Sequence, residues 1–210
     1  MASISVVVPE FLFIGNAKAA KDQSLLQKVS ITHVVNLAGK VWFPGQFIYK
    51  ECKIADAEDV DLEPILADVF AFIDAASEKK KGRIFVHCLA GVSRSAAIVL
   101  GYLMHRFNLA LWHSFVYLKF RRDSIRPNHG FLQCLSKLEI KLFGRQLTSD
   151  EILQNLTITF RTVWRHDSNL CPQMFCLNLR TSNPFAQIRA PPRADSLSQV
   201  KCNGDSAESR

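Results

Sequence analysis

The sequence predicts an α/β domain in which a central, mostly parallel (mixed) sheet is flanked by helices. Short apolar and β-branched runs come mainly in the first half of the chain, and segments with helical spacing come mainly in the second half. The run 83–86 has no polar residue after Arg83, which is typical of a central strand that is buried on both faces. The segment 95–107 that follows is apolar on nearly every side, so we expect a helix inside the core.

The strands are expected where β-branched or apolar residues form short runs. The first run ends at Gly15-Asn16, a dipeptide that marks a turn, and the third run alternates between apolar and polar residues only in part. In chain order, the expected strands cover residues 11–14, 33–37, 47–54 and 83–86.

The helices are expected where apolar residues recur at a spacing of three and four. The segment 63–76 has a broad apolar face and is followed by the run 79–82, whose lysines and glycine are favoured at a helix C-terminus. Gly144 is the expected stop of the last helix. In chain order, the expected helices cover residues 18–28, 63–76, 95–107, 112–120 and 131–143.

The composition changes near Gln146, which sets the expected domain boundary. We expect one domain over residues 1–146 and a partly ordered C-terminal extension over 147–182. The segments 157–164 and 175–179 alternate at a period of two, which leaves two interpretations open: two further strands or loosely held segments. Residues 183–210 are rich in Pro, Arg, Ser, Asp and Gln, so we expect a disordered tail there.

Charge and targeting patterns restrict the partners and the compartment. The formal net charge is +7 and the pI is about 9.2, which favours anionic partners without choosing among nucleic acid, acidic lipid and phosphorylated substrates. The chain begins without a secretory signal, has no apolar run long enough to span a membrane, and carries Ala2 where a myristoylation signal needs glycine. We therefore expect a cytoplasmic and/or nuclear protein with reduced thiols and no lipid anchor, whose oligomeric state stays open.

One segment has the composition of an anion-binding loop, namely His87-Cys88-Leu89-Ala90-Gly91-Val92-Ser93-Arg94. A Cys six residues before an Arg is a weak signal by itself, because the chain has six cysteines. The setting makes it stronger. Gly91 gives the backbone freedom to bend, and a helix begins where the loop ends, so that its free N–H groups point at the loop centre.

The residue types in this loop predict a phosphate-transfer site. The helix N-terminus and Arg94 lower the pKa of the Cys88 thiol, which makes it a nucleophilic thiolate, and Arg94 also binds phosphate oxygens and the transition state. Ser95 offers a hydroxyl that supports the leaving thiolate and could also be the N-cap, and His87 supports the loop by hydrogen bonding. The residues expected to bind the phosphate are Leu89, Ala90, Gly91, Val92, Ser93 and Arg94.

This loop and the apolar helix after it resemble the signature of the dual-specificity protein phosphatases, within the cysteine-based protein tyrosine phosphatase superfamily. The runs 11–15 and 33–37 look like the first strands of that family, and 126–131 looks like the segment that opens its last helix. The resemblance covers residues 5–145 and implies a protein tyrosine phosphatase-like fold and a catalytic domain over 1–146 that needs no cofactor.

The resemblance also implies further site residues. By its position after the third expected strand, Asp56 matches the general acid/base of the family, and Asp59 is the alternative. An asparagine at the position of Asn128 helps to fix the phosphate loop in the family.

The implied reaction is the hydrolysis of phosphotyrosine and of phosphoserine or phosphothreonine on proteins, through a cysteinyl phosphate. The loop interior has no lysine, which favours phosphoproteins, kinases among them, over phosphoinositides and RNA 5′-phosphates, and no nucleic-acid partner is expected. The first expected strand lies close to residue 1, so we expect no kinase-docking domain ahead of it and interpret the chain as a small, atypical member. The alternatives are a low-activity module that binds phosphoproteins as a scaffold, and a phosphatase of phosphoinositides or RNA 5′-phosphates.

A metal site is not expected. The chain ends with a group of potential zinc ligands, but their spacing fits no tight Cys-x-x-Cys pattern. These residues are His166, Cys171, Cys176 and Cys202.

Overall fold

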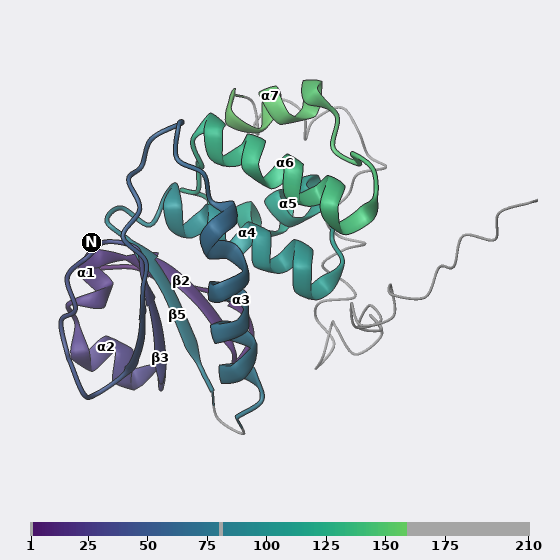
Figure 1. Ribbon diagram of the computed structural model, residues 1–210. Helices are drawn as coiled ribbons and strands as arrows, with labels where there is room; N and C mark the ends of the chain where they lie inside the picture. The colour runs from purple at the N-terminus through teal and green to yellow at the C-terminus, as the bar shows by residue number, and fades with distance from the viewer. Residues whose placement is uncertain (1, 80–81, 159–210) are drawn as a thin grey trace, which may run out of the picture.

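The computed structural model describes residues 2–79 and 82–158 (Figure 1). Its strands form a five-stranded sheet in the order β1-β2-β5-β3-β4. The β1 and β2 strands pair antiparallel, and the other three neighbouring pairs are parallel. The strands are β1 (Ile4–Val8), β2 (Leu12–Asn16), β3 (His33–Asn36), β4 (Ile48–Glu51) and β5 (Ile84–Cys88). The predicted fold class, α/β with a central, mostly parallel mixed sheet flanked by helices, is confirmed.

Helices cover both faces of this sheet (Figure 1). Two short helices, α1 and α2, lie on one face, and α4 packs against β2 and β5 on the other face, between the sheet and the helices α5 and α6. The helices are α1 (Ala17–Ala20), α2 (Gln23–Lys28), α3 (Glu63–Ser77), α4 (Arg94–Phe107), α5 (Leu111–Arg121), α6 (His129–Phe143) and α7 (Asp150–Ile158).

The core is divided by the sheet, as the alternation of strand side chains requires. Ile84 and Val86 of β5 join the larger cluster with α3 and α4, whereas Phe85 between them joins the smaller cluster with α1 and α2. All five residues of β5 are buried, as predicted for the run 83–86. Eleven of the fourteen residues of α4 are buried too, which confirms the prediction of a core helix.

Four of the predicted helices agree with α3, α4, α5 and α6 to within two residues at each end. Gly144 ends α6 as predicted, with a left-handed φ of 71°. The prediction of one helix over 18–28 is wrong, because the chain turns between α1 and α2. The side chain of Asn16 accepts a hydrogen bond from Ala19 N–H and that of Asp22 accepts one from Leu25 N–H, so each short helix has its own N-cap.

Two elements were not predicted. The β1 strand forms the edge next to β2, and the Tyr117 hydroxyl of α5 donates a hydrogen bond to its Val7 carbonyl. Beyond residue 146, α7 packs on α5 and α6, and its Leu153 and Leu156 belong to the larger core cluster. The domain boundary near residue 146 stays a prediction.

The strands predicted beyond α6 have different outcomes. The first, over 157–164, begins inside α7, because Thr157 and Ile158 are helical. Its remaining residues and the strand predicted over 175–179 lie outside the described residues, as does the tail 183–210.

A buried carboxylate joins α5, α6 and the approach to α7. The side chain of Glu139 is fully buried and accepts hydrogen bonds from the N–H groups of Leu111, Leu147 and Thr148, at 2.7, 2.9 and 2.7 Å, and from the Thr148 hydroxyl at 2.8 Å. Buried charged groups are tolerated where such hydrogen bonds replace water. Glu139 therefore fixes the segment that leads from α6 to α7.

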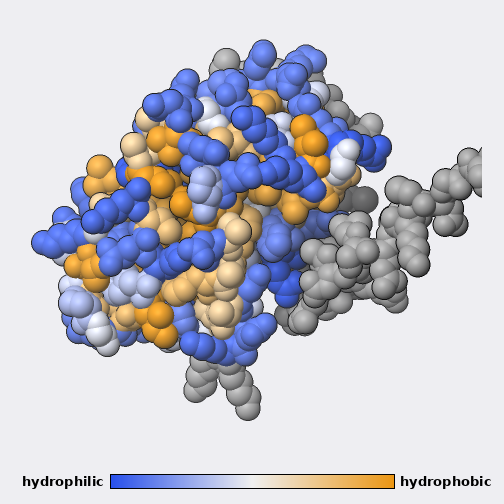
Figure 2. All heavy atoms as spheres, in the orientation of Figure 1, coloured by the Kyte–Doolittle hydropathy of each residue, from blue (hydrophilic) through white to orange (hydrophobic). Residues whose placement is uncertain are grey.

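The surface is mixed in character. Figure 2 shows small apolar groups separated by hydrophilic side chains on the face that it presents. Within residues 2–79 and 82–158, no helix has both the length and the apolar character that crossing a bilayer requires.

Candidate active site

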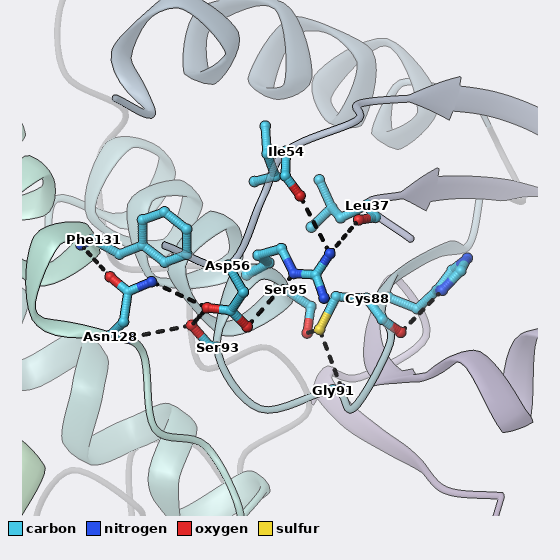
Figure 3. Close-up of polar contacts among 11 residues, drawn as sticks. Leu37, Ile54, Asp56, Cys88, Gly91, Ser93, Ser95, Asn128 and Phe131 are labelled. Carbon is cyan, nitrogen blue, oxygen red and sulfur yellow. Dashed lines mark hydrogen bonds and ion pairs between the residues drawn. The ribbon is translucent and has the colours of Figure 1, made fainter. Parts of the chain in front are cut away.

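The 88–94 loop connects β5 to α4 at the carboxyl ends of three parallel strands, β2, β5 and β3 (Figure 3). Cys88 is the last residue of β5 and is 1% exposed. Its Sγ accepts a hydrogen bond from Gly91 N–H at 3.2 Å and lies 3.3 Å from the Ser95 hydroxyl. The sulfur therefore lies at the floor of the loop, where N–H and O–H donors surround it.

These donors set the protonation state of the thiol. Burial alone raises the pKa of Cys88, but hydrogen bonds from the Ser95 hydroxyl and from the N–H groups of Ser95, Val92 and Gly91 lower it, so that the pKa lies below its ordinary value. The thiolate is the nucleophilic form of cysteine. Ser95 is the second residue of α4 and not its N-cap, which is Ser93 and makes no side-chain capping bond.

We expect the Ser95→Ala variant to raise the pKa of Cys88, because it removes the donor that lowers this pKa most. A hydrogen bond to a charged group contributes about 1.5–3 kcal/mol, so we expect alkylation by iodoacetamide to slow by about tenfold on the acidic side of the titration. The rising limb of the alkylation rate against pH would then move to higher pH.

The Ser114→Ala variant is the matched control, because Ser114 is also fully buried and its hydroxyl has no hydrogen-bond partner among the described residues. If both variants gave the wild-type pH profile, Ser95 would not stabilise the thiolate.

Gly91 lets the loop fold over the sulfur. Its φ is 71°, which is a left-handed conformation, and a Cβ there would lie 2.6 Å from the Gly15 carbonyl oxygen. The loop carbonyls are bound from outside, since Ala17 N–H donates to Leu89 at 3.1 Å and Arg126 N–H donates to Val92 at 2.8 Å. The loop N–H groups are thereby left to face the centre, as in other anion-binding nests.

Arg94 begins α4 and reaches across the carboxyl end of the sheet. Its Nη1 donates to the carbonyls of Leu37 and Ile54 at 3.1 and 3.2 Å, which fixes the plane of the guanidinium group. Its Nε lies 3.6 Å from Asp56 Oδ2 and has no hydrogen-bond partner among the described residues, although it is buried. This Nε–H group is therefore available to donate a hydrogen bond to an oxyanion bound above Cys88.

Asp56 lies in the same cluster, although thirty-two positions in the sequence separate it from Cys88. Its Oδ1 accepts hydrogen bonds from the Ser93 hydroxyl at 2.6 Å and from Asn128 Nδ2 at 3.0 Å (Figure 3). Asp59, the alternative general acid, is exposed and has no hydrogen bond or ion pair within the described part of the chain. The geometry therefore favours Asp56.

Asn128 links the loop, the acid and α6. Its side-chain oxygen accepts from Phe131 N–H and caps α6, and its own N–H donates to the Ser93 hydroxyl at 3.2 Å. It contacts the loop through its main chain, whereas its side-chain N–H group holds Asp56.

His87 lies beside the loop and is 1% exposed. Its ring stacks on Phe85 with centroids 5.4 Å apart, and its Nδ1 lies 3.4 Å from the Cys88 carbonyl. Burial lowers the pKa of His87 to about 4, so the ring is neutral at pH 7. A neutral, stacked ring is better suited to support the 88–94 loop than to act as a proton donor.

Sequence reasoning missed Arg122. This side chain is 7% exposed, and its Nε donates to the Gly91 carbonyl at 2.8 Å while its Nη1 and Nη2 donate to the hydroxyls of Ser5 and Ser3. It ties the 88–94 loop to β1 and its approach. Two adjacent arginines at a helix end are typical of a solvated surface, so the sequence offered no signal that Arg122 is buried.

The comparisons with known proteins agree with this geometry. Residues 12–141, more than half of the chain, match the family model described as dual specificity phosphatase, catalytic domain. The chain belongs to the dual specificity phosphatase family. The predicted family is thereby confirmed.

Two named relatives match the chain over only part of their own length. A Dictyostelium discoideum protein named as a probable dual specificity protein phosphatase is 42% identical over 149 residues, which are 71% of this chain and 54% of that protein. Dual specificity protein phosphatase 19 of Mus musculus is 37% identical over 136 residues, which are 64% of this chain and 61% of that protein. The matched region thus spans little more than half of these relatives.

Solved structures share the fold. The human tyrosine phosphatase-like serine/threonine/tyrosine-interacting protein matches with a TM-score of 0.62 and 31% identity, over 66% of this chain and 96% of that one. A mouse protein described as a dual specificity phosphatase, solved in complex with zinc tungstate, matches with a TM-score of 0.62 and 34% identity, over 67% of this chain and 89% of that one.

The described residues contain no group of three or more His, Cys, Asp or Glu side chains arranged to hold a metal ion. The four potential zinc ligands considered above, His166, Cys171, Cys176 and Cys202, lie outside the described residues.

Proposed function

We propose that this chain is a cysteine-dependent protein phosphatase that hydrolyses phosphotyrosine and phosphoserine or phosphothreonine through a cysteinyl phosphate. The observation that carries the proposal is the Cys88 sulfur, which lies inside a ring of N–H and O–H donors that lower its pKa, with Arg94 and Asp56 beside it. A family relative that was solved with tungstate supports the same ligand chemistry, because tungstate is a tetrahedral oxyanion like phosphate.

In the first step the Cys88 thiolate attacks phosphorus and forms the S–P bond, while the bond between phosphorus and the substrate oxygen breaks. The loop N–H groups and Arg94 bind the phosphoryl oxygens and stabilise the charge of the transition state. Asp56 acts as the general acid and donates a proton to the leaving oxygen, so that a neutral alcohol or phenol departs.

In the second step water hydrolyses the cysteinyl phosphate. The Asp56 carboxylate left by the first step accepts a proton from the attacking water, and the Cys88 thiolate leaves phosphorus. The Ser95 hydroxyl, 3.3 Å from the sulfur, stabilises the thiolate as it departs. Inorganic phosphate is released, and Asp56 is again protonated.

The substrate class and the location follow as parts of the same proposal. The loop side chains between Cys88 and Arg94 include no lysine, and Leu89 is 66% exposed, so the mouth of the site offers an apolar contact and no extra cation inside the loop. These features favour phosphoproteins, kinases among them, over phosphoinositides and RNA ends. A thiolate nucleophile must stay reduced, which suits the cytoplasm or the nucleus.

A panel of substrates tests this proposal. We expect the full chain to release phosphate from phosphotyrosine and phosphothreonine peptides with a kcat/KM at least about tenfold above its values for a soluble phosphoinositide and a 5′-phosphorylated oligoribonucleotide. A faster reaction with the phosphoinositide or with the oligoribonucleotide would show that the substrate class is not phosphoproteins. No turnover with any substrate, combined with retained binding of phosphopeptides, would instead indicate a scaffold.

A further inference from the structure

A basic rim, which we define as Lys21, Lys40 and Trp42, is formed by the segments that follow β2 and β3. The Nζ of Lys21 lies 4.4 Å from the ring centroid of Trp42, and the Nζ of Lys40 lies 4.2 Å from it. Both lysines are exposed, and neither forms an ion pair with a carboxylate in the described part of the chain. Two ammonium groups thus share one aromatic ring, which holds them in place by cation–π attraction.

Each of the two segments that carry the rim begins beside a residue that hydrogen-bonds to the 88–94 loop. The α1 helix begins with Ala17, whose N–H donates to the Leu89 carbonyl at 3.1 Å, and Figure 1 shows α1 at the end of the sheet where β5 enters this loop. Lys21 follows one helical turn after Ala17, about 6 Å along the helix from the residue that contacts the loop.

The second segment leaves β3, on the other side of β5. The carbonyl of Leu37 accepts a hydrogen bond from Arg94 Nη1 at 3.1 Å, and Lys40 comes three residues later. The side chain of Asn36 donates to the Lys40 carbonyl at 3.0 Å and fixes the path of this segment. Because β2 and β3 both flank β5, the two rim segments leave the sheet on either side of the strand that delivers Cys88.

The segment that carries Asp56 has the opposite charge. It lies between β4 and α3, and three further carboxylates on it are exposed, namely Glu58, Asp59 and Asp61. The segments at this end of the sheet therefore offer cations after β2 and β3 and anions after β4. This asymmetry would orient a peptide that carries a second negative group.

We propose that Lys21, Lys40 and Trp42 form a second recognition site for an anionic side chain of the phosphoprotein substrate, either a carboxylate or a second phosphate. Lys21 lies about 6 Å along the helix from Ala17, and three extended residues span at most about 11 Å from Leu37 to Lys40. Extended peptides advance by about 3.3 Å per residue, so we place this anion about two to four residues from the phosphorylated residue. The inference rests on the proposed function, since it assigns the substrate class of that site.

The rim is suited to this task because its cations are positioned before the ligand arrives. The aromatic ring holds both ammonium groups, so less side-chain freedom is lost when an anion binds. Each exposed charge pair changes an affinity by only a few fold, so two of them predict a preference for an acidic peptide of about tenfold. This preference would fall at high salt.

The experiment compares two phosphotyrosine peptides that differ only in whether Glu or Gln occupies the positions two to four residues from the phosphotyrosine. The measured quantity is the ratio of their kcat/KM values within each variant, which removes any change in the basal rate. We expect a ratio of about ten for the wild-type chain and close to one for the K21E/K40E variant. The W42L variant, which keeps both charges, is expected to give an intermediate ratio.

The K28E/K137E variant is the matched control, since it changes the net charge by the same amount through two exposed lysines on α2 and α6. We expect it to keep the wild-type ratio. An equal loss in this control would show that only net charge matters and would overturn the proposal, and so would a wild-type ratio near one.

Binding to the Cys88→Ser variant separates this inference from the proposed function. Fluorescence polarisation would measure the affinity of each labelled peptide for Cys88→Ser and for Cys88→Ser combined with K21E/K40E. Even if the wild-type chain hydrolysed neither peptide, this comparison would show whether K21E/K40E abolishes the preference for the acidic peptide. Binding to vesicles of phosphatidylcholine that contain phosphoinositide would be measured for the same variants. If the K21E/K40E changes abolished this binding and left the selectivity between the two peptides intact, the rim would be a membrane contact and the proposal would be wrong.

Discussion

The Cys88→Ser variant is expected to lose turnover by at least about four orders of magnitude, because removal of a covalent nucleophile costs as much in enzymes of comparable mechanism. A serine hydroxyl at this position is not ionised at neutral pH, because an alcohol is far less acidic than a thiol. The donors that lower the pKa of Cys88 are too weak to make up that difference. Hydrolysis of para-nitrophenyl phosphate and of a phosphotyrosine peptide would measure the loss.

The same variant is expected to keep its fold and its affinity for phosphate. Serine occupies nearly the volume of cysteine, and Gly91 N–H and the Ser95 hydroxyl stay in place to hydrogen-bond it. Thermal unfolding with and without a phosphopeptide would show a ligand-dependent rise in the melting temperature. The Cys134→Ser variant, which changes a half-buried cysteine on α6, is the control and is expected to keep wild-type activity. Residual turnover in Cys88→Ser would contradict the mechanism.

The layered fold was largely predictable from residue patterns. The apolar strand β5 and the core helix α4 are adjacent in sequence, so local hydrophobicity was enough to place both. The edge strand β1 was harder, because its residues Ile4–Val8 are only partly buried and it pairs with the sheet on one side alone. The helix α7 was missed because the sequence near it was interpreted by its alternation at a period of two, whereas Leu153 and Leu156 are buried in the core that α7 joins with α5 and α6.

The candidate site was predictable where it is continuous in sequence and less so elsewhere. Cys88, Gly91 and Arg94 share one loop whose sequence, together with the apolar helix after it, resembles the family signature. Three long-range contacts could not be read from the chain: the Arg94 bonds to the carbonyls of Leu37 and Ile54, the buried side chain of Arg122 under Gly91, and the hydrogen bond of Asn128 to Asp56. Each depends on how segments far apart in sequence fold together, and a main-chain carbonyl has no sequence signature at all.

The Asp56→Asn variant is expected to lower kcat by about 10²–10³-fold on phosphopeptides, the usual contribution of a general acid. Asparagine keeps an oxygen that can accept from the Ser93 hydroxyl and from Asn128 Nδ2, so the loop geometry is preserved while the proton donor is lost. A good leaving group needs little protonation, so we expect a much smaller loss with para-nitrophenyl phosphate than with a phosphoserine peptide.

The dependence of the rate on the leaving group distinguishes a lost acid from a damaged site. In the wild-type chain, kcat is expected to vary little across a series of aryl phosphates because the acid protonates the leaving oxygen, and in Asp56→Asn it is expected to fall steeply as the leaving group becomes poorer. The Asp59→Asn variant is the matched control, since Asp59 lies on the same segment and has no polar partner within the described residues. If Asp59→Asn gave the steep dependence on the leaving group and Asp56→Asn kept the shallow one, the acid would be Asp59, and the hydrogen bonds that hold Asp56 against Ser93 and Asn128 would be structural.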